Sequence, residues 1–177
     1  MKKLFSTVLM ALGLLLPGTG AAQTKGENTM DLTKQAYEFG QFGNTYIVRI
    51  NPGQKLIASL LQFCRQQNIG LAEISGVGSL KSATLGFFDP ESKQYVEQII
   101  TEPLELASLI GNVTLMDGEV IIHPHAVIAG ADYAAKAGHL VEAEVSLTAE
   151  VVISRIDGSV NKIFNDKLGL KLMNFSK

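Results

Sequence analysis

VTLMDGEVIIHPHAVIAGADYAAKAGHLVEAEVS, residues 113–146, is the stretch of the sequence that decides the fold. Near its beginning, Asp117-Gly118 separates the β-prone runs Val113–Met116 and Glu119–Ile122. An Asp-Gly pair between two such runs is typical of a two-residue β-hairpin, because both turn residues adopt a positive φ. The stretch therefore predicts antiparallel strands joined by short turns.

All three histidines of the sequence, His123, His125 and His139, lie in this stretch. His123 and His125 are two positions apart on an expected strand, so their side chains leave the same face. Pro124 leaves an alternative open, because proline within a strand favours an edge or a bulge. A bulge between the two histidines would turn their rings apart.

A loop centred near Asp132 is expected to return the chain, so that the strands on either side of it pair. His125 then faces His139, with their Cβ atoms about 5 Å apart. His123 lies one step further along the same face, opposite Val141. The register therefore predicts that three imidazoles converge on a volume small enough for one ion.

Three neutral imidazoles suit Zn²⁺, Ni²⁺, Fe²⁺ or Co²⁺ rather than Ca²⁺ or Mg²⁺. We expect a divalent transition metal, with zinc first among the candidates. Three protein ligands leave a coordination position open for water or a substrate oxygen, which allows hydrolysis or carbonyl polarisation. The alternative is a set of histidines with structural roles only.

The surroundings of the histidines are expected to be apolar, because Val141, Ala143 and Val145 would share their face of the partner strand. A catalytic acid or base must then come from elsewhere in the chain. Glu105 is the candidate catalytic residue, and Glu150 is a second one, because each places a charge in an apolar, β-prone run that leaves it in need of a partner. The alternative for each is an exposed strand position.

One segment outside this stretch has helical periodicity. After an expected strand at Thr45–Ile50, Asn51-Pro52 suits a helix start, with asparagine as the N-cap and proline in the first turn. The helix is expected to reach about Asn68, with Gly70 as a stop. Its apolar face recurs at intervals of three and four residues and consists of Leu56, Ile57, Leu60, Leu61 and Cys64.

The chain after this helix is β-prone throughout. Gly76-Val77-Gly78-Ser79 lies between two expected strands, so we expect a tight turn or a bulge there rather than a phosphate-binding loop. One helix and many hairpin-linked strands predict an α+β fold, a largely antiparallel β-sheet with one main helix packed on it. The other strands are expected at Leu71–Val77, Ala83–Phe88, Tyr95–Ile100, Leu104–Leu109, Val120–Ala129, His139–Ser146 and Thr148–Ile156, with a break at Gly111-Asn112.

The beginning of the sequence has the pattern of a secretory signal. Two lysines precede the apolar run Leu4–Leu16, which is too short to span a bilayer, and Gly20-Ala21-Ala22 suits cleavage. The mature protein would be periplasmic or secreted, with no stable membrane span. We expect a signal peptide at 1–22, a lead-in at 23–44 of which part of Tyr37–Phe42 docks on the domain, and the domain itself at 45–177.

The charge of the chain argues against nucleic acid as a partner. The sequence has 15 basic and 17 acidic residues, and removal of residues 1–22 takes away two lysines and no acid, so the formal charge goes from −2 to −4. No Lys/Arg run supplies the electrostatic footprint of a nucleic-acid-binding surface. The one cysteine, Cys64, cannot form an internal disulfide, and we expect it to be buried.

A set of short motifs along the chain resembles the PPC (plant and prokaryote conserved) domain family. Each motif is weak alone, and their order over residues 45 to 157 is specific. They are YIVRI (46–50), ISGVGS (74–79), ATLGFFD (83–89), EPLEL (102–106), LIGN (109–112), DG (117–118), HPH (123–125), GHL (138–140) and TAEV (148–151).

The resemblance implies an α+β fold, a homotrimeric assembly and, as in prokaryotic members, metal binding through His123, His125 and His139. Plant members join this domain to AT-hook segments that bind DNA, and this sequence contains no Arg-Gly-Arg-Pro hook. It also has EPLEL at 102–106 where plant members carry an arginine, and Pro124 where the family has leucine. We expect an exported metal-binding protein, either an enzyme that acts on a small molecule or a non-catalytic trimeric ligand-binding module. A DNA-binding protein is the alternative that the family label implies.

Overall fold

The computed structural model describes residues 35–176, which form nine strands and one helix. The helix, α1, is Leu56–Gln66, and it is the only helix among the described residues. The strands are β1 (Tyr37–Phe42), β2 (Thr45–Ile50), β3 (Ala72–Asp89), β4 (Gln94–Ile100), β5 (Leu104–Met116), β6 (Glu119–Ala129), β7 (Ala135–Arg155), β8 (Asn161–Asn165) and β9 (Leu170–Asn174).

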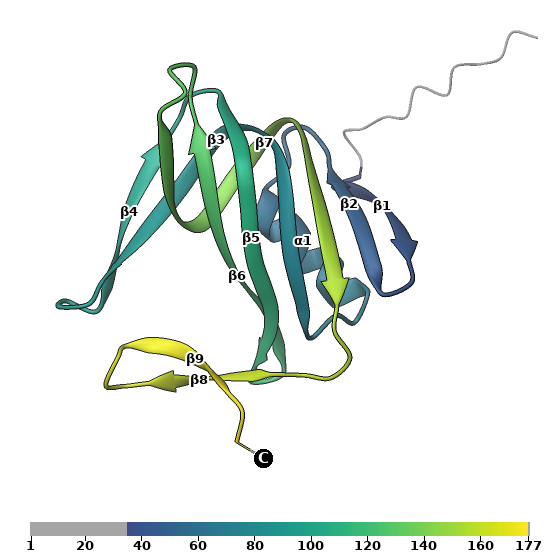
Figure 1. Cartoon of the computed structure of the whole chain (residues 1–177), viewed down its shortest axis with the longest axis vertical. Helices are drawn as coiled ribbons and strands as arrows, with labels where there is room; N and C mark the ends of the chain where they lie inside the picture. Colours follow the sequence, from purple (N-terminus) through teal and green to yellow (C-terminus); the bar gives the residue numbers. More distant parts are fainter. Residues whose placement is uncertain (1–34, 177) are drawn as a thin grey trace, which may run out of the picture. The chain divides into compact units, whose positions relative to one another are not determined.

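The strands form one sheet in the order β1-β2-β7-β3-β5-β8-β9, with β4 paired to β3, and β6 paired to both β5 and β7 (Figure 1). Four strands, β3, β5, β6 and β7, therefore pair in a closed cycle. All described pairs are antiparallel except a single contact between β5 and β8. Helix α1 packs on β6 and β7. The α+β fold with a largely antiparallel sheet and one main helix is confirmed.

Three strands are longer than the sequence pattern predicts. β7 runs unbroken for 21 residues, because its two halves pair with different partners, the first with β6 and the second with β2, while β3 accompanies most of its length. β5 continues through Gly111-Asn112, so the break expected there is wrong. Neighbouring strands on both sides of these strands supply backbone hydrogen bonds where the local sequence alone favours a turn.

The bulge alternative for Gly76–Ser79 is confirmed, and the turn alternative is wrong. β3 passes through this segment as one strand of 18 residues, and its pairing with β5 shifts register between Gly76 and Gly78. A Cβ on Gly78 would lie 2.5 Å from the carbonyl oxygen of Thr148 on β7. Glycine is needed here because the β7 backbone approaches too closely for a side chain.

Helix α1 begins later than predicted, at Leu56 rather than near Asn51-Pro52. Asn51 is buried, and its Nδ2 donates a hydrogen bond to the Gln35 carbonyl oxygen at 2.8 Å, so its side chain does not cap the helix. The backbone N–H groups of Ile57 and Ala58 instead donate to the carboxylate of Glu142 on β7, at 2.8 and 3.2 Å. A glutamate on a strand that is distant in the sequence thus takes the capping role that was expected of Asn51.

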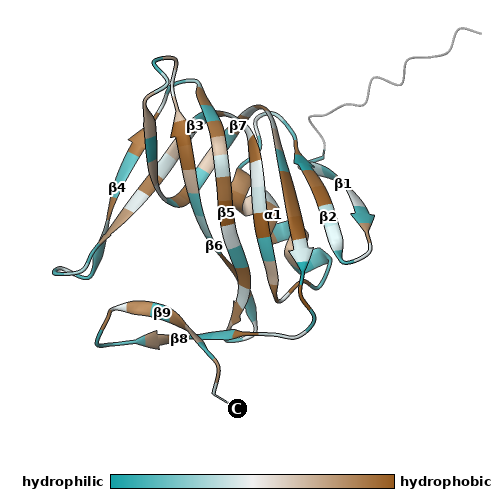
Figure 2. Ribbon diagram, in the orientation of Figure 1, coloured by the Kyte–Doolittle hydropathy of each residue, from teal (hydrophilic) through white to brown (hydrophobic). Residues whose placement is uncertain are grey.

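The core lies where α1 covers the sheet, and apolar residues alternate with polar ones along the strands that face it (Figure 2). Cys64 is fully buried there, as expected, and burial raises the pKa of its thiol to about 12. At 11 residues, α1 is too short to cross a membrane, and the described residues contain no other helix.

Two sequence predictions concern the beginning of the chain. The signal peptide expected at 1–22 lies outside the described residues. Part of the expected lead-in, Tyr37–Phe42, forms β1 and pairs along its whole length with β2.

Candidate metal centre

Two adjacent strands carry the three histidines. His123 and His125 lie on β6, His139 lies on β7, and His125 pairs directly with His139, as the centre near Asp132 predicts. The pairing of β6 with β7 ends at this position, so Val141 is not opposite His123. Beyond His139, β7 continues along β3, and from Ala149 it also pairs with β2.

Pro124 does not interrupt the alternation between the two histidines of β6. The register with β5 is continuous from Asn112↔His123 through Gly111↔Pro124 to Ile110↔His125. Among the described strands, none pairs with the other side of β6 at Pro124, because the pairing with β7 begins at His125. The missing N–H of Pro124 therefore breaks no ladder on that side, and the two imidazoles leave the same face.

The three imidazoles surround a common point. Their ring centroids are 5.2 Å apart for His123–His125, 5.3 Å for His123–His139 and 5.6 Å for His125–His139. One nitrogen from each ring lies within 4.8 Å of the others. Zinc–nitrogen bonds of about 2.0–2.1 Å require only a modest closing of the rings around one ion.

One buried nitrogen of this cluster has no hydrogen-bond partner among the described residues. His139 Nδ1 is buried and makes no hydrogen bond within the described part of the chain. A buried acceptor without a donor is unfavourable, and a metal ion is one group that can use such a lone pair. The donor set and this unsatisfied nitrogen together fit a divalent transition metal held by His123, His125 and His139.

The surroundings keep two of the three imidazoles in the neutral form that binds a metal. Burial, with smaller effects from Lys162, His139 and His125, lowers the pKa of His123 to about 4. Burial also lowers the pKa of His139, with smaller effects from His125 and Lys162. These two imidazoles are therefore neutral at neutral pH, which is the state that binds a metal.

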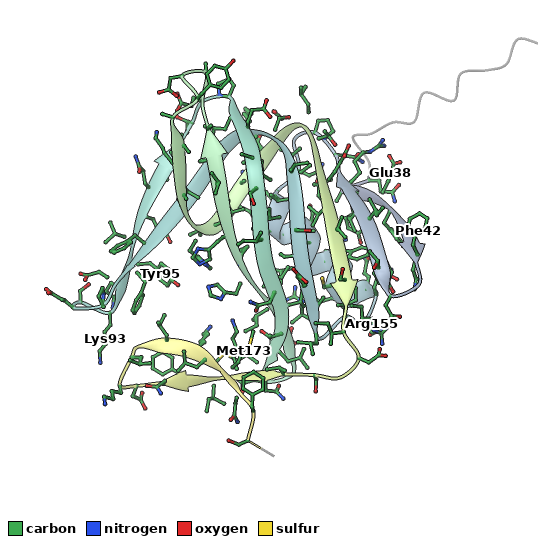
Figure 3. All side chains as sticks on the ribbon, viewed as in Figure 1. Glu38, Phe42, Lys93, Tyr95, Arg155 and Met173 are labelled. Carbon is green, nitrogen blue, oxygen red and sulfur yellow. The ribbon has the colours of Figure 1, made fainter. Side chains whose placement is uncertain are left out.

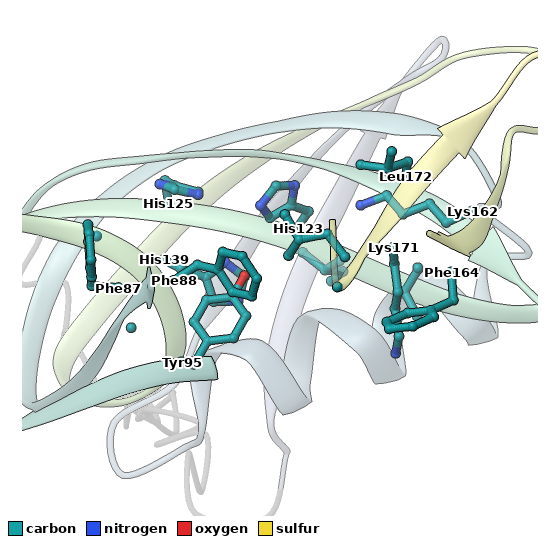
Figure 4. A pocket seen from close by; sticks show the side chains of 16 residues that line it. Phe87, Phe88, Tyr95, His123, His125, His139, Lys162, Phe164, Lys171 and Leu172 are labelled. Atoms are coloured by element: carbon teal, nitrogen blue, oxygen red, sulfur yellow. The ribbon is translucent and has the colours of Figure 1, made fainter. Parts of the chain in front are cut away.

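The histidines open into a pocket of about 590 Å³ between two hairpins. The hairpin of β3 and β4 contributes aromatic side chains, and Tyr95 lies against His139 with ring centroids 5.3 Å apart. The β8–β9 hairpin closes the opposite side and brings Lys162 toward the imidazoles (Figure 4). The main side chains of the walls are Phe87, Phe88, Tyr95, Ile121, Phe164 and Leu172.

The apolar floor predicted from β7 is wrong. A register shift between β3 and β7 leaves Val141 as an extra residue, because Thr84 pairs with Glu142 and Leu85 pairs with Leu140. Beyond this irregularity, Ala143 and Val145 face the buried core and do not line the pocket. The apolar walls come from the two hairpins instead.

The structure does not bring the two predicted carboxylates to the histidines. Glu105 is exposed on β5, opposite Ala129, which lies four residues or about 13 Å along β6 from His125. Glu150 is exposed on β7, opposite Arg49. Neither lines the pocket, so Glu105 is not placed to act as acid or base beside an ion in the same subunit.

Sequence reasoning missed the C-terminal hairpin. No strand was predicted after Ile156, yet β8 and β9 pair over five positions and contribute Lys162, Phe164 and Leu172 to the pocket. The apolar runs on either side of Asn165–Gly169 are the signal that could have revealed a hairpin. Nothing in the sequence marks which hairpin face covers the histidines.

Comparison with family models gives a match over residues 37–157 to the Plants and Prokaryotes Conserved (PCC) domain, the PPC family of the sequence motifs. The chain belongs to this family. The PPC match starts at β1, includes all three histidines and ends before the β8–β9 hairpin. Comparison with curated proteins gave no match.

Three similar solved structures extend the comparison. A candidate DNA-binding protein from Bacteroides thetaiotaomicron is 33% identical, with a TM-score of 0.78 over 80% of this chain and 99% of its own. A metal-containing protein from Archaeoglobus fulgidus is 33% identical, with a TM-score of 0.71 over 79% of this chain and 99% of its own. A PPC protein from Pyrococcus horikoshii is 34% identical, with a TM-score of 0.70 over 80% of this chain and 96% of its own.

Proposed function

We propose that this protein is an exported PPC-domain protein that binds one divalent transition-metal ion, zinc first among the candidates, through His123, His125 and His139. The observation that carries the proposal is the convergence of three imidazole nitrogens within 4.8 Å at the base of a pocket. The description of the Archaeoglobus structure as metal-containing supports it. A bound ion with three protein ligands would keep a position open to the pocket, which suits a small molecule.

The test is metal analysis of the purified protein. The full chain is expressed without a histidine tag, dialysed against a chelator, reloaded with Zn²⁺ and measured by plasma mass spectrometry. We expect about one ion per chain, and a loss of at least about tenfold in affinity in His125→Gln, because one of three ligands is gone. Lys167→Met, an exposed residue of the turn between β8 and β9, is the control and should bind like the wild type. Absence of uptake by the wild type would refute the proposal.

Catalysis is a further step of this proposal. A metal ion at this site would supply a Lewis acid and lower the pKa of a bound water. The aromatic and aliphatic walls of the pocket would bind a substrate and orient it toward the ion. A screen of small esters and oxo acids with zinc-loaded protein, repeated with His125→Ala, separates an enzyme from a non-catalytic binding module. Turnover that His125→Ala abolishes identifies an enzyme.

DNA binding is the second candidate, and the description of the Bacteroides structure is the observation that favours it. The formal charge of −2, which export would take to −4, opposes it. A gel-shift assay at low salt gives the strongest non-specific binding, so the absence of retardation there removes this candidate.

Export and assembly complete the proposal. Cell fractionation checks whether the pattern at residues 1–22 directs the chain to the periplasm or the medium. A homotrimer would use apolar side chains that the single chain leaves open. Phe87 and Val96, which pair across β3 and β4, are 69% and 62% exposed, and Ile110 on β5 is 60% exposed.

A further inference from the structure

We propose that the pocket binds a small organic anion, a carboxylate attached to an apolar group, whose charged end lies between Lys162 and the ion at the three histidines. This inference rests on the proposed function, because it names the class of molecule that the open coordination position accepts. Lys162, near the start of β8, is the residue that carries it.

Lys162 is a largely buried residue that has no anionic partner among the described residues. Its relative exposure is only 8%, and no ion pair in the described part of the chain includes it. Desolvation lowers the pKa of its ammonium group, and Lys171 adds to this effect. The ammonium group lines the pocket with no carboxylate beside it in the described part of the chain, so the partner that its charge would take is an anion from outside the chain.

The charge of the whole pocket leads to the same conclusion. Neutral imidazoles do not offset the charge of a divalent ion, and Lys162 and Lys171 add two more positive groups. Among the described residues that line the pocket, none is acidic. Like charges gathered in one pocket repel one another, and a bound anion offsets this repulsion.

The walls decide what is attached to the anionic group. Tyr95 and Phe88 stack edge to face on one side with ring centroids 5.3 Å apart, and Phe164 and Leu172 line the other side. A volume of about 590 Å³ exceeds the needs of an inorganic ion. The walls therefore suit a carboxylate that carries an aromatic or branched aliphatic group.

The position of Lys162 is fixed by contacts at both ends of its hairpin. β8 is joined to β5 by the hydrogen bond from Leu115 N to Val160 O at 2.9 Å. At the hairpin tip, Lys93 of the β3–β4 turn donates from Nζ to the Asp166 carbonyl oxygen at 3.1 Å (Figure 3). Because the PPC match ends at residue 157, the β8–β9 side of this anion site, with Lys162, lies outside the matched residues, whereas the three histidines lie within them.

Isothermal titration of purified, zinc-loaded protein with phenylacetate tests the inference. Phenylacetamide, a neutral molecule of the same shape, is the matched probe. Lys162→Met removes the charge and keeps the length of the side chain, Lys162→Arg keeps the charge, and Lys167→Met removes a charge from the same hairpin outside the pocket. Zinc content is measured in every sample and serves as the check of folding.

We expect phenylacetate to bind more tightly than phenylacetamide, and Lys162→Met to weaken it about 10- to 100-fold, the range of a hydrogen bond between charged groups. Lys162→Arg should restore most of the affinity, and Lys167→Met should leave it unchanged. Equal binding of the two probes, or no effect of Lys162→Met in a zinc-loaded sample, overturns the inference and leaves the proposed function intact. Absence of zinc from the wild type overturns the proposed function, and the Lys162 comparison on that protein still decides the anion site.

Discussion

At the scale of single residues, the neutral state of the imidazoles is the property that metal binding needs. Burial, with smaller effects from Lys162 and the other two histidines, lowers the pKa of His123 from its ordinary 6.5 to about 4. Between these values the unfolded chain binds a proton that the folded chain does not, so the folded state loses stability as the pH falls from 6.5 toward 4. Urea unfolding of metal-free protein at pH 7, 6 and 5 should show this loss, and His123→Gln should show a shallower one. If the unfolding free energy of the wild type and of His123→Gln fell equally with pH, this prediction would be contradicted.

Gly111 is the second residue on which the site depends. It faces Pro124 across β5 and β6, and a Cβ at Gly111 would lie 2.4 Å from the His123 carbonyl oxygen and 2.9 Å from Pro124 Cα. These are backbone atoms, so Gly111→Ala should displace His123 and cost about 1–3 kcal/mol of unfolding free energy. Zinc affinity and urea unfolding measure both effects. Gly130→Ala is the control, because its Cβ would meet nothing closer than 3.6 Å.

At the scale of secondary-structure elements, the hydrogen bonds between β7 and the first turn of α1 lead to a separate prediction. Glu142 accepts hydrogen bonds from the first turn of the helix, at Ile57 and Ala58. Glu142→Gln removes the charge at the helix N-terminus and should lower the unfolding free energy by about 1 kcal/mol. Urea unfolding measures it against Glu97→Gln, an exposed glutamate of β4. An unchanged midpoint in Glu142→Gln would show that the cap contributes nothing.

The secondary-structure elements also indicate how much of this structure the sequence predicts. The hairpin at Asp117-Gly118 and the pairing of His125 with His139 follow from turn chemistry and from the two-residue period of a strand, so both were predictable. The start of α1 was not, because its cap, Glu142, is far away in the sequence. The walls of the pocket were not predictable either. The register shift at Val141 directs Ala143 and Val145, which were expected to line the site, into the core instead. No residue pattern in the sequence indicates that the hairpin of β8 and β9 covers the histidines.

At the scale of the whole molecule, an exposed apolar pair on β3 and β4 supports assembly. Phe87 and Val96 face each other and are largely exposed. We expect light scattering to give three times the mass of one chain, and Val96→Lys to shift the protein toward the monomer, because it places a charge in an apolar interface. Gln94→Lys, an exposed change on the same strand, should leave the mass unchanged. A monomeric wild type would contradict the proposed homotrimer.

The central claim is that one ion is held by the three histidines. X-ray absorption at the zinc edge of the loaded protein tests it most directly, because multiple scattering from imidazole rings counts the histidine ligands. The account predicts three imidazole nitrogens at about 2.0–2.1 Å and at least one oxygen in the remaining position. A spectrum with fewer than three imidazoles, or one that His125→Gln leaves unchanged, would contradict it.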